Sequence, residues 1–130
     1  MMKIFALAAA TAALLAANAA SADPIEGIWQ TQPDNGFFAR VSITPCAKAF
    51  CGTIAKTYRD DKEVSSPNIG RQILIDMVPD GNGGYQGRLW RPSNNKVYIG
   101  KARLSGNSMS LSGCVAGGLL CKSQTWSRVK

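Results

Sequence analysis

Short apolar and β-branched runs recur along the chain after residue 22, and clusters of Gly, Pro, Asn and Asp separate them. Such clusters are typical of tight turns, and no helical periodicity extends through this part of the sequence. The apolar face of residues 37–44 consists of Phe37, Ala39, Val41 and Ile43, and that of residues 70–78 consists of Ile73, Ile75 and Met77. The pattern predicts eight strands, over residues 25–31, 37–44, 50–58, 70–78, 85–91, 96–104, 107–115 and 122–129.

Eight short, sequential strands with mostly short connections predict an all-β domain. Two arrangements are economical, an up-and-down antiparallel barrel and a sandwich. We favour the barrel because closure removes exposed strand edges. The interior of an eight-stranded barrel is either nearly filled by side chains or holds one small ligand. The connection at residues 59–69 is longer and charged, and we expect it to hold a single helical turn or a mobile lid.

The first 22 residues have the pattern of a cleaved signal peptide. Met1-Met2-Lys3 is followed by an almost unbroken apolar run and then by the small residues Ala20-Ser21-Ala22. The apolar run is shorter than the roughly 20 residues that a helix needs to cross a bilayer. We therefore expect a signal peptide at residues 1–22 and one exported domain at residues 23–130, periplasmic or secreted, monomeric and without a transmembrane helix.

Four cysteines lie beyond the signal peptide, in a compartment that permits disulfides. Four cysteines allow three pairings. We favour Cys46–Cys51 and Cys114–Cys121, because each pair flanks a short segment between two strands. A metal or redox centre is the less favoured interpretation, since zinc sites often use histidine, redox enzymes typically use Cys-x-x-Cys, and the chain has no histidine.

Several kinds of chemistry are absent from the sequence. Without histidine there is no Ser-His-Asp or Cys-His arrangement, and no Gly-rich phosphate loop occurs. The net charge is +7, but the basic residues are spread singly, without a run of three. We therefore expect no catalytic residues, no metal, no cofactor and no nucleic-acid partner, and predict that the protein is not an enzyme.

Two segments suggest a known architecture. Gly27-Ile28-Trp29 opens the first predicted strand, and Arg128 closes the last. This pair resembles lipocalin-like (calycin) barrels, in which an arginine near the chain end lies across the tryptophan of a Gly-x-Trp motif. The resemblance implies that Trp29 and Arg128 close one end of the barrel through a cation–π and packing contact.

A second resemblance covers nearly all of the chain after residue 22. It is carried by Gly27-Ile28-Trp29, the Pro-Cys…Cys-Gly stretch at residues 45–52, residues 87–98 with Arg91-Pro92 and Lys96-Val97-Tyr98, and the closing residues 124–129. These segments look like an uncharacterised family of short secreted bacterial proteins with a single β-rich domain of unknown function. The chain departs from that pattern at Asn94-Asn95, where an acidic residue and a glycine are more usual. Its connection at residues 59–69, although the longest in this chain, is short in comparison with that family.

These observations leave three functions open. The first is a carrier of a small apolar ligand, whose interior site would use Trp29, Tyr85, Leu89 and Tyr98. The second is a module that binds or inhibits an exported or envelope protein through the apolar hairpin tip with Leu119 and Leu120, although this tip could equally fold back as a barrel plug. The third is a structural envelope protein without a pocket. We favour an exported binding domain of unknown specificity.

Overall fold

The computed structural model describes residues 22–130. The predicted signal peptide lies, apart from Ala22, outside the described residues. The strands are β1 (Gly27–Gln30), β2 (Phe37–Cys46), β3 (Ala49–Arg59), β4 (Lys62–Val64), β5 (Gln72–Pro79), β6 (Gly84–Arg91), β7 (Lys96–Ser105), β8 (Ser108–Val115) and β9 (Leu120–Arg128), with a 3-10 turn, η2 (Ala116–Gly118), between the last two. Among residues 22–130, no helix is long and apolar enough to cross a membrane.

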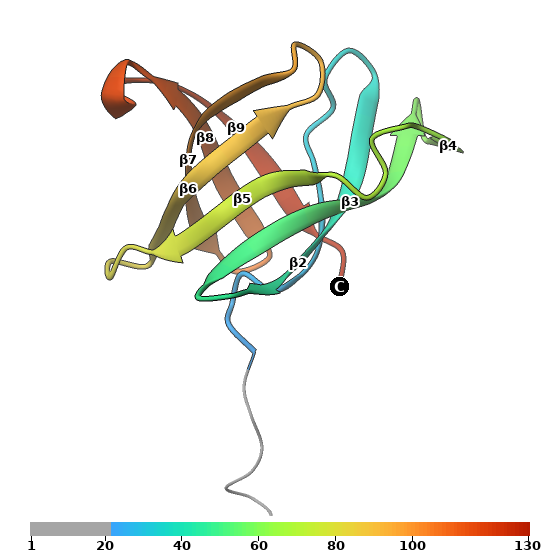
Figure 1. Cartoon of the computed structure of the whole chain (residues 1–130). Helices are drawn as coiled ribbons and strands as arrows, with labels where there is room; N and C mark the ends of the chain where they lie inside the picture. Colours follow the sequence, from blue (N-terminus) through green and yellow to red (C-terminus); the bar gives the residue numbers. More distant parts are fainter. Residues whose placement is uncertain (1–21) are drawn as a thin grey trace, which may run out of the picture.

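The strands form one antiparallel sheet that closes on itself (Figure 1). Their order is β2-β1-β9-β8-β7-β6-β5-β3-β4, and an additional β2–β3 pairing joins the two sides. β4 pairs only with β3, so it extends the β3 hairpin and the closed barrel has eight strands. The expected eight-stranded antiparallel barrel is confirmed.

The barrel has two different ends. One end, toward the top of Figure 1, carries the β1–β2 loop, the β6–β7 turn and the β8–β9 tip, and we call it the open end. The other end carries the β2–β3, β5–β6 and β7–β8 turns together with the chain terminus after β9, and we call it the closed end. The core fills the interior next to the closed end. Its largest fully buried side chains are Trp29, Trp126, Ile25, Ile43, Ile54, Leu74, Met77, Met109 and Leu111.

The alternation predicted for residues 37–44 holds for Ala39, Val41 and Ile43, which are buried. Phe37 is the exception, with 46% of its surface exposed at the open end. The alternation predicted for residues 70–78 is wrong in part. Leu74 and Met77 are both fully buried although they are three residues apart, because the register of β5 against β6 shifts between Ile75 and Val78.

Asp76 sits within this β-bulge, with a φ of 50°. Gly87 of the facing strand makes room for the bulge, since a β-carbon at that position would lie 2.5 Å from the Asp76 carbonyl oxygen. Period-two alternation cannot predict such an inserted residue.

The connection at residues 59–69 contains no helix. Instead, Asp60 and Asp61, both with positive φ, form a tight turn, and Lys62–Val64 returns along β3 as β4. Aspartate tolerates this conformation, which suits two-residue hairpin turns. Turns at residues 67–70 then lead into β5. The predicted helical turn is therefore wrong, and the alternative of a mobile lid stays a prediction.

Candidate ligand-binding site

A cavity of about 710 Å³ opens into the barrel from the open end. Such a volume lies within the range of about 300–1,000 Å³ that small-molecule pockets span. The residues that line it come from most strands of the barrel and from three connections, those before β2, before β5 and after β6. Its lining includes Thr31, Gln32, Asp34, Phe37, Ala39, Ile54, Thr57, Val64, Ile73, Leu89, Trp90, Arg91, Tyr98, Gly113, Lys122, Gln124 and Trp126.

The deeper wall of the cavity is apolar. Ile54, Leu89 and Trp126 are buried and line it. Gly113 on β8 lines the cavity without a side chain, and a β-carbon there would make ordinary contacts with Leu89 at 3.4 Å and with Tyr98 at 3.5 Å. A larger residue at position 113 would fill the cavity instead.

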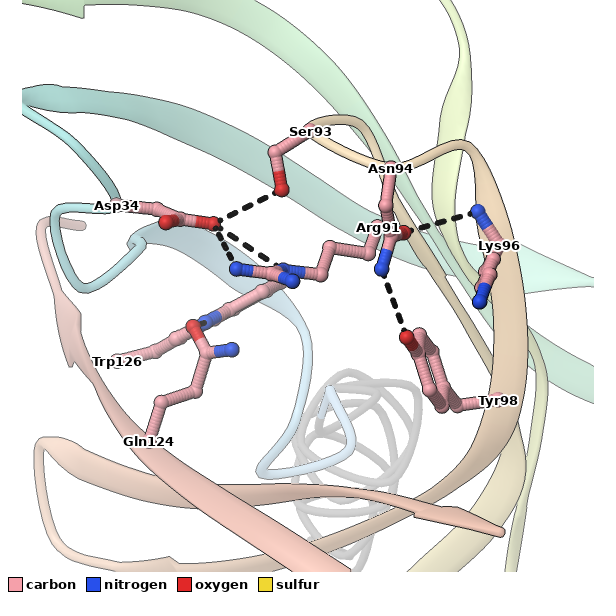
Figure 2. Close-up of polar contacts among 8 residues, drawn as sticks. All are labelled: Asp34, Arg91, Ser93, Asn94, Lys96, Tyr98, Gln124 and Trp126. Atoms are coloured by element: carbon pink, nitrogen blue, oxygen red, sulfur yellow. Dashed lines mark hydrogen bonds and ion pairs between the residues drawn. The ribbon is translucent and has the colours of Figure 1, made fainter.

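A polar bridge spans two connections at the mouth of the cavity (Figure 2). Asp34, in the loop before β2, accepts hydrogen bonds on one carboxylate oxygen from Nε of Arg91 at 3.2 Å, from Nη2 of Arg91 at 3.0 Å and from Oγ of Ser93 at 3.2 Å. Arg91 ends β6, and Ser93 lies in the following turn. Because both charged side chains are more than two-fifths exposed, the pair contributes little to stability.

A second group orients the hydroxyl of Tyr98. Asn94, in the β6–β7 turn, accepts a hydrogen bond on Oδ1 from the backbone N–H of Lys96 at 3.0 Å. Its Nδ2 then donates to the Tyr98 hydroxyl oxygen at 2.8 Å. Since the hydroxyl oxygen accepts this bond, its own hydrogen remains available for another partner.

The hydrogen-bond donors next to two glutamines also determine the orientation of their side-chain amides. The indole Nε1 of Trp126 donates to Oε1 of Gln124 at 2.8 Å. The backbone N–H of Thr125 donates to Oε1 of Gln32 at 2.9 Å. Both donors lack acceptor capacity, so each glutamine presents its oxygen to them and retains the two donors of its amide nitrogen. Gln32 and Gln124 both line the cavity.

Trp29 and Arg128 are in contact at the closed end, as the resemblance to lipocalin-like barrels implies. The guanidinium carbon of Arg128 lies 4.3 Å from the ring centroid of Trp29, which is fully buried. Nη1 and Nη2 of Arg128 donate to the carbonyl oxygens of Glu26 at 2.9 Å and Pro24 at 2.6 Å. Gly27 has a φ of 138°, and a β-carbon on it would lie 2.6 Å from the Lys130 carbonyl oxygen. This crowding explains the glycine of the Gly-x-Trp motif.

Tyr85 also lies at the closed end. Its ring packs edge-on against Phe50, with centroids 6.1 Å apart, and its hydroxyl donates to the Asp23 carboxylate. Burial and the Asp23 carboxylate raise the pKa of Tyr85 well above its ordinary value.

Of the four residues expected to contact a ligand, Leu89 and Tyr98 line the cavity, whereas Trp29 and Tyr85 do not. Trp29 and Tyr85 lie instead at the closed end, outside this cavity. Aromatic residues on strands point inward at either end of a barrel, and only the tertiary structure shows which end is plugged.

The sequence pattern does not single out Asp34, Asn94 or Gln124, because their turns and strand ends resemble ordinary solvent-exposed positions. Inward alternation from the buried Trp126 would have placed Gln124 and Lys122 on the interior face of the last strand. No comparable signal exists for Asp34.

The structure contains the two disulfides favoured from the sequence, with Cα–Cα distances of 5.8 Å for Cys46–Cys51 and 4.1 Å for Cys114–Cys121. Cys46–Cys51 links β2 to β3 at the closed end, and Cys114–Cys121 links β8 to β9 at the open end. Within residues 22–130, Cys46, Cys51 and Asp76 form the one group with metal-ligand spacing, and the disulfide occupies both sulfurs.

The tip between β8 and β9 projects from the open end (Figure 1). Leu119 is 84% exposed and Leu120 is 66% exposed. Neither lines the cavity, so the alternative in which this tip plugs the barrel is wrong.

The closed eight-stranded antiparallel barrel, with a cavity at one end, is a lipocalin-like fold. The solved structure of protein HP1028 from the human pathogen Helicobacter pylori, described as belonging to the lipocalin family, is similar to this chain with a TM-score of 0.67. The two share 18% sequence identity over 84% of this chain and 85% of that one, a likeness that shows the fold alone.

The chain belongs to the family of uncharacterized proteins conserved in bacteria called DUF2147, whose sequence profile matches residues 27–128. A search of curated proteins finds no significant match. The expected membership of an uncharacterised bacterial family and the expected lipocalin-like barrel are both confirmed.

Proposed function

We propose that the protein is an exported, non-enzymatic binding protein that holds one small, largely apolar ligand inside the barrel. The cavity of about 710 Å³ at the open end carries this proposal. Its deeper wall is apolar and its mouth is polar, which is the usual arrangement of small-molecule sites. Two disulfides fit export from the cytoplasm, where such bonds are rare.

Ligand binding is tested by intrinsic fluorescence. Trp90 and Trp126 line the cavity, so a ligand that enters it changes their surroundings. We expect the emission to shift on titration with at least one class among fatty acids, haem and aromatic metabolites, at concentrations in the micromolar range. If the emission responds to none of them, and native mass spectrometry of the protein purified from its producing cells shows no bound small molecule, the carrier function is wrong.

A cavity-filling variant separates specific binding from adsorption to the surface. Gly113→Phe places a ring in the space between Leu89 and Tyr98 and should abolish the fluorescence response. Gly113→Ala is the matched control, because its methyl group makes only ordinary contacts and leaves most of the cavity open. Equal binding by both variants would place the ligand outside the barrel.

Export is tested by the N-terminus of the protein made in a bacterial host. We expect the purified protein to begin at Asp23 and to be released with the periplasmic fraction or into the medium. A chain that retains residues 1–22 and stays in the cytoplasm would contradict this part of the proposal.

A second candidate function rests on the exposed tip at Leu119 and Leu120. Adjacent exposed leucines on a projecting loop are typical of contact surfaces. The double variant Leu119→Asp, Leu120→Asp should lose capture of a partner protein from an envelope extract, while Val97→Asp serves as the control at another exposed apolar position. Unchanged capture by the tip variant would exclude this surface.

A further inference from the structure

Several polar side chains that line the cavity have acceptors that are already used and donors that are free within the described chain. Asp34 is the one carboxylate among the lining residues, and Arg91 and Ser93 already use it. Arg91 and Lys122 are the two lining cations. Because Arg91 is paired with Asp34, Lys122 is the one cation of the lining without an ion-pair partner among residues 22–130.

Three neutral side chains of the lining also have free hydrogen-bond donors. The oxygen atoms of Gln124 and Gln32 are taken by the Trp126 indole and the Thr125 backbone, which leaves both amide nitrogens as donors. The Tyr98 hydroxyl accepts from Asn94 and keeps its hydrogen. Figure 2 shows the Arg91 side chain reaching toward Asp34, the Tyr98 hydroxyl directed toward Asn94, and Gln124 beside Trp126. Arg91, Tyr98 and Gln124 come from β6, β7 and β9 and line the same cavity.

From this surplus of donors we infer that the ligand carries a carboxylate head group, held at the mouth by Tyr98, Gln124 and Lys122, and a single apolar chain that extends toward Ile54 and Leu89. A carboxylate only accepts hydrogen bonds, and bonds from neutral or charged donors to an anion are stronger than bonds between neutral groups. A ligand with an ammonium head group would leave these donors unpaired. The inference deepens the proposed carrier function and rests on it.

The orientation of Asn94 gives a sharp test. Asn94→Asp keeps the shape of the side chain and the hydrogen bond from the Lys96 backbone. Its second oxygen can only accept, so the Tyr98 hydroxyl must turn and donate to it, and the donor facing the ligand is lost. Asn95→Asp is the matched control. It adds the same charge one residue away, keeps the acceptor for the Trp90 indole and tolerates the φ of 58° at that position.

The experiment compares fatty acids of 8, 12 and 16 carbons with the alcohols of the same length at pH 8, with Kd measured by tryptophan fluorescence. In the unaltered protein we expect at least one acid to bind about ten-fold or more tightly than its alcohol, a preference expected of charge-assisted hydrogen bonds. Asn94→Asp should bring this ratio to within about two-fold, chiefly by weakening the acid, while Asn95→Asp keeps most of it. Lys122→Met should lower the ratio without weakening the alcohol.

The outcomes distinguish the inference from the function on which it rests. If acids and alcohols bind equally well, the head-group inference is overturned and the carrier function stands. If no member of either series binds, both are overturned for such ligands. If Asn94→Asp and Asn95→Asp lower the ratio equally, long-range charge accounts for the preference and the role of Tyr98 is overturned.

Discussion

The two ends of the barrel use similar residue types for opposite purposes. At the closed end, Trp29 is fully buried under Arg128, whose guanidinium donates to two backbone carbonyls. At the open end, Arg91 pairs with an exposed carboxylate, and Tyr98 retains a free hydroxyl hydrogen. The tyrosine at the closed end, Tyr85, instead donates its hydrogen to Asp23.

Under the proposed function, this difference assigns stability to the closed end and ligand binding to the open end. At the closed end, the side-chain donors are paired with acceptors of the protein and the aromatic rings are buried, so these contacts contribute to folding. At the open end, neighbouring residues orient the side chains but leave hydrogen-bond donors without partners in the described part of the protein. In the proposed function, these donors bind the ligand. Substitutions at the closed end should therefore change the free energy of unfolding, and substitutions at the open end should change ligand binding.

The largest expected effect is at Trp29. Trp29→Ala removes a fully buried side chain and leaves a cavity, which should lower the free energy of unfolding by about 3–5 kcal/mol. Phe37→Ala, at an exposed aromatic of the open end, should cost about 0.5 kcal/mol or less. Urea unfolding followed by circular dichroism measures both. Equal losses would mean that the two ends are packed alike.

The two disulfides allow the same comparison with covalent links. They close short loops, with sequence separations of 5 and 7 residues. In the loop-entropy account, replacing either pair by serines lowers the free energy of unfolding by about 2 kcal/mol. We expect the Cys114→Ser, Cys121→Ser variant to alter ligand affinity as well, because this pair borders the mouth, and the Cys46→Ser, Cys51→Ser variant to leave affinity unchanged. The reverse pattern in titrations would contradict the division.

Alkaline pH should weaken the closed end. The folded state raises the pKa of Tyr85 above its ordinary value of 10.0, so above about pH 10 the unfolded chain loses a proton that the folded chain keeps. Stability is then fully present below that pH and falls above it, with a slope of at most about 1.4 kcal/mol per pH unit from this residue. The slope between pH 10 and 11 should be smaller in Tyr85→Phe. An unchanged slope would assign the alkaline loss to other groups.

The smallest expected effect on stability is at Asp34. Because the Asp34–Arg91 pair is exposed, Asp34→Asn should change the free energy of unfolding by less than about 1 kcal/mol. The same change frees Arg91 from its partner and removes the one lining carboxylate, so it should tighten binding of a carboxylate ligand. A stability loss comparable with that of Trp29→Ala would show that the bridge holds the barrel closed.

The two ends of the barrel differ in how many of their functional residues the sequence predicts. At the closed end, the resemblance of Gly27, Trp29 and Arg128 to the motif of lipocalin-like barrels implies the contact between Trp29 and Arg128. At the open end, the sequence predicts only Leu89 and Tyr98. Asn94, which orients the Tyr98 hydroxyl, lies in a turn whose composition also fits an ordinary surface loop.

The sequence by itself predicted the eight strands of the barrel and favoured the closed antiparallel arrangement and the local disulfide pairing, because alternation, turn residues and cysteine spacing are short-range signals. Only the tertiary structure decided that β5 carries a bulge, that residues 62–64 form a hairpin, and which end of the barrel is open. The direction of the Tyr98 hydrogen bond is set locally, by Asn94 and the Lys96 backbone in the β6–β7 turn. That this turn lies beside Gln124 and Lys122 at the mouth of a cavity is decided by the tertiary structure, because the lining comes from segments far apart in the chain.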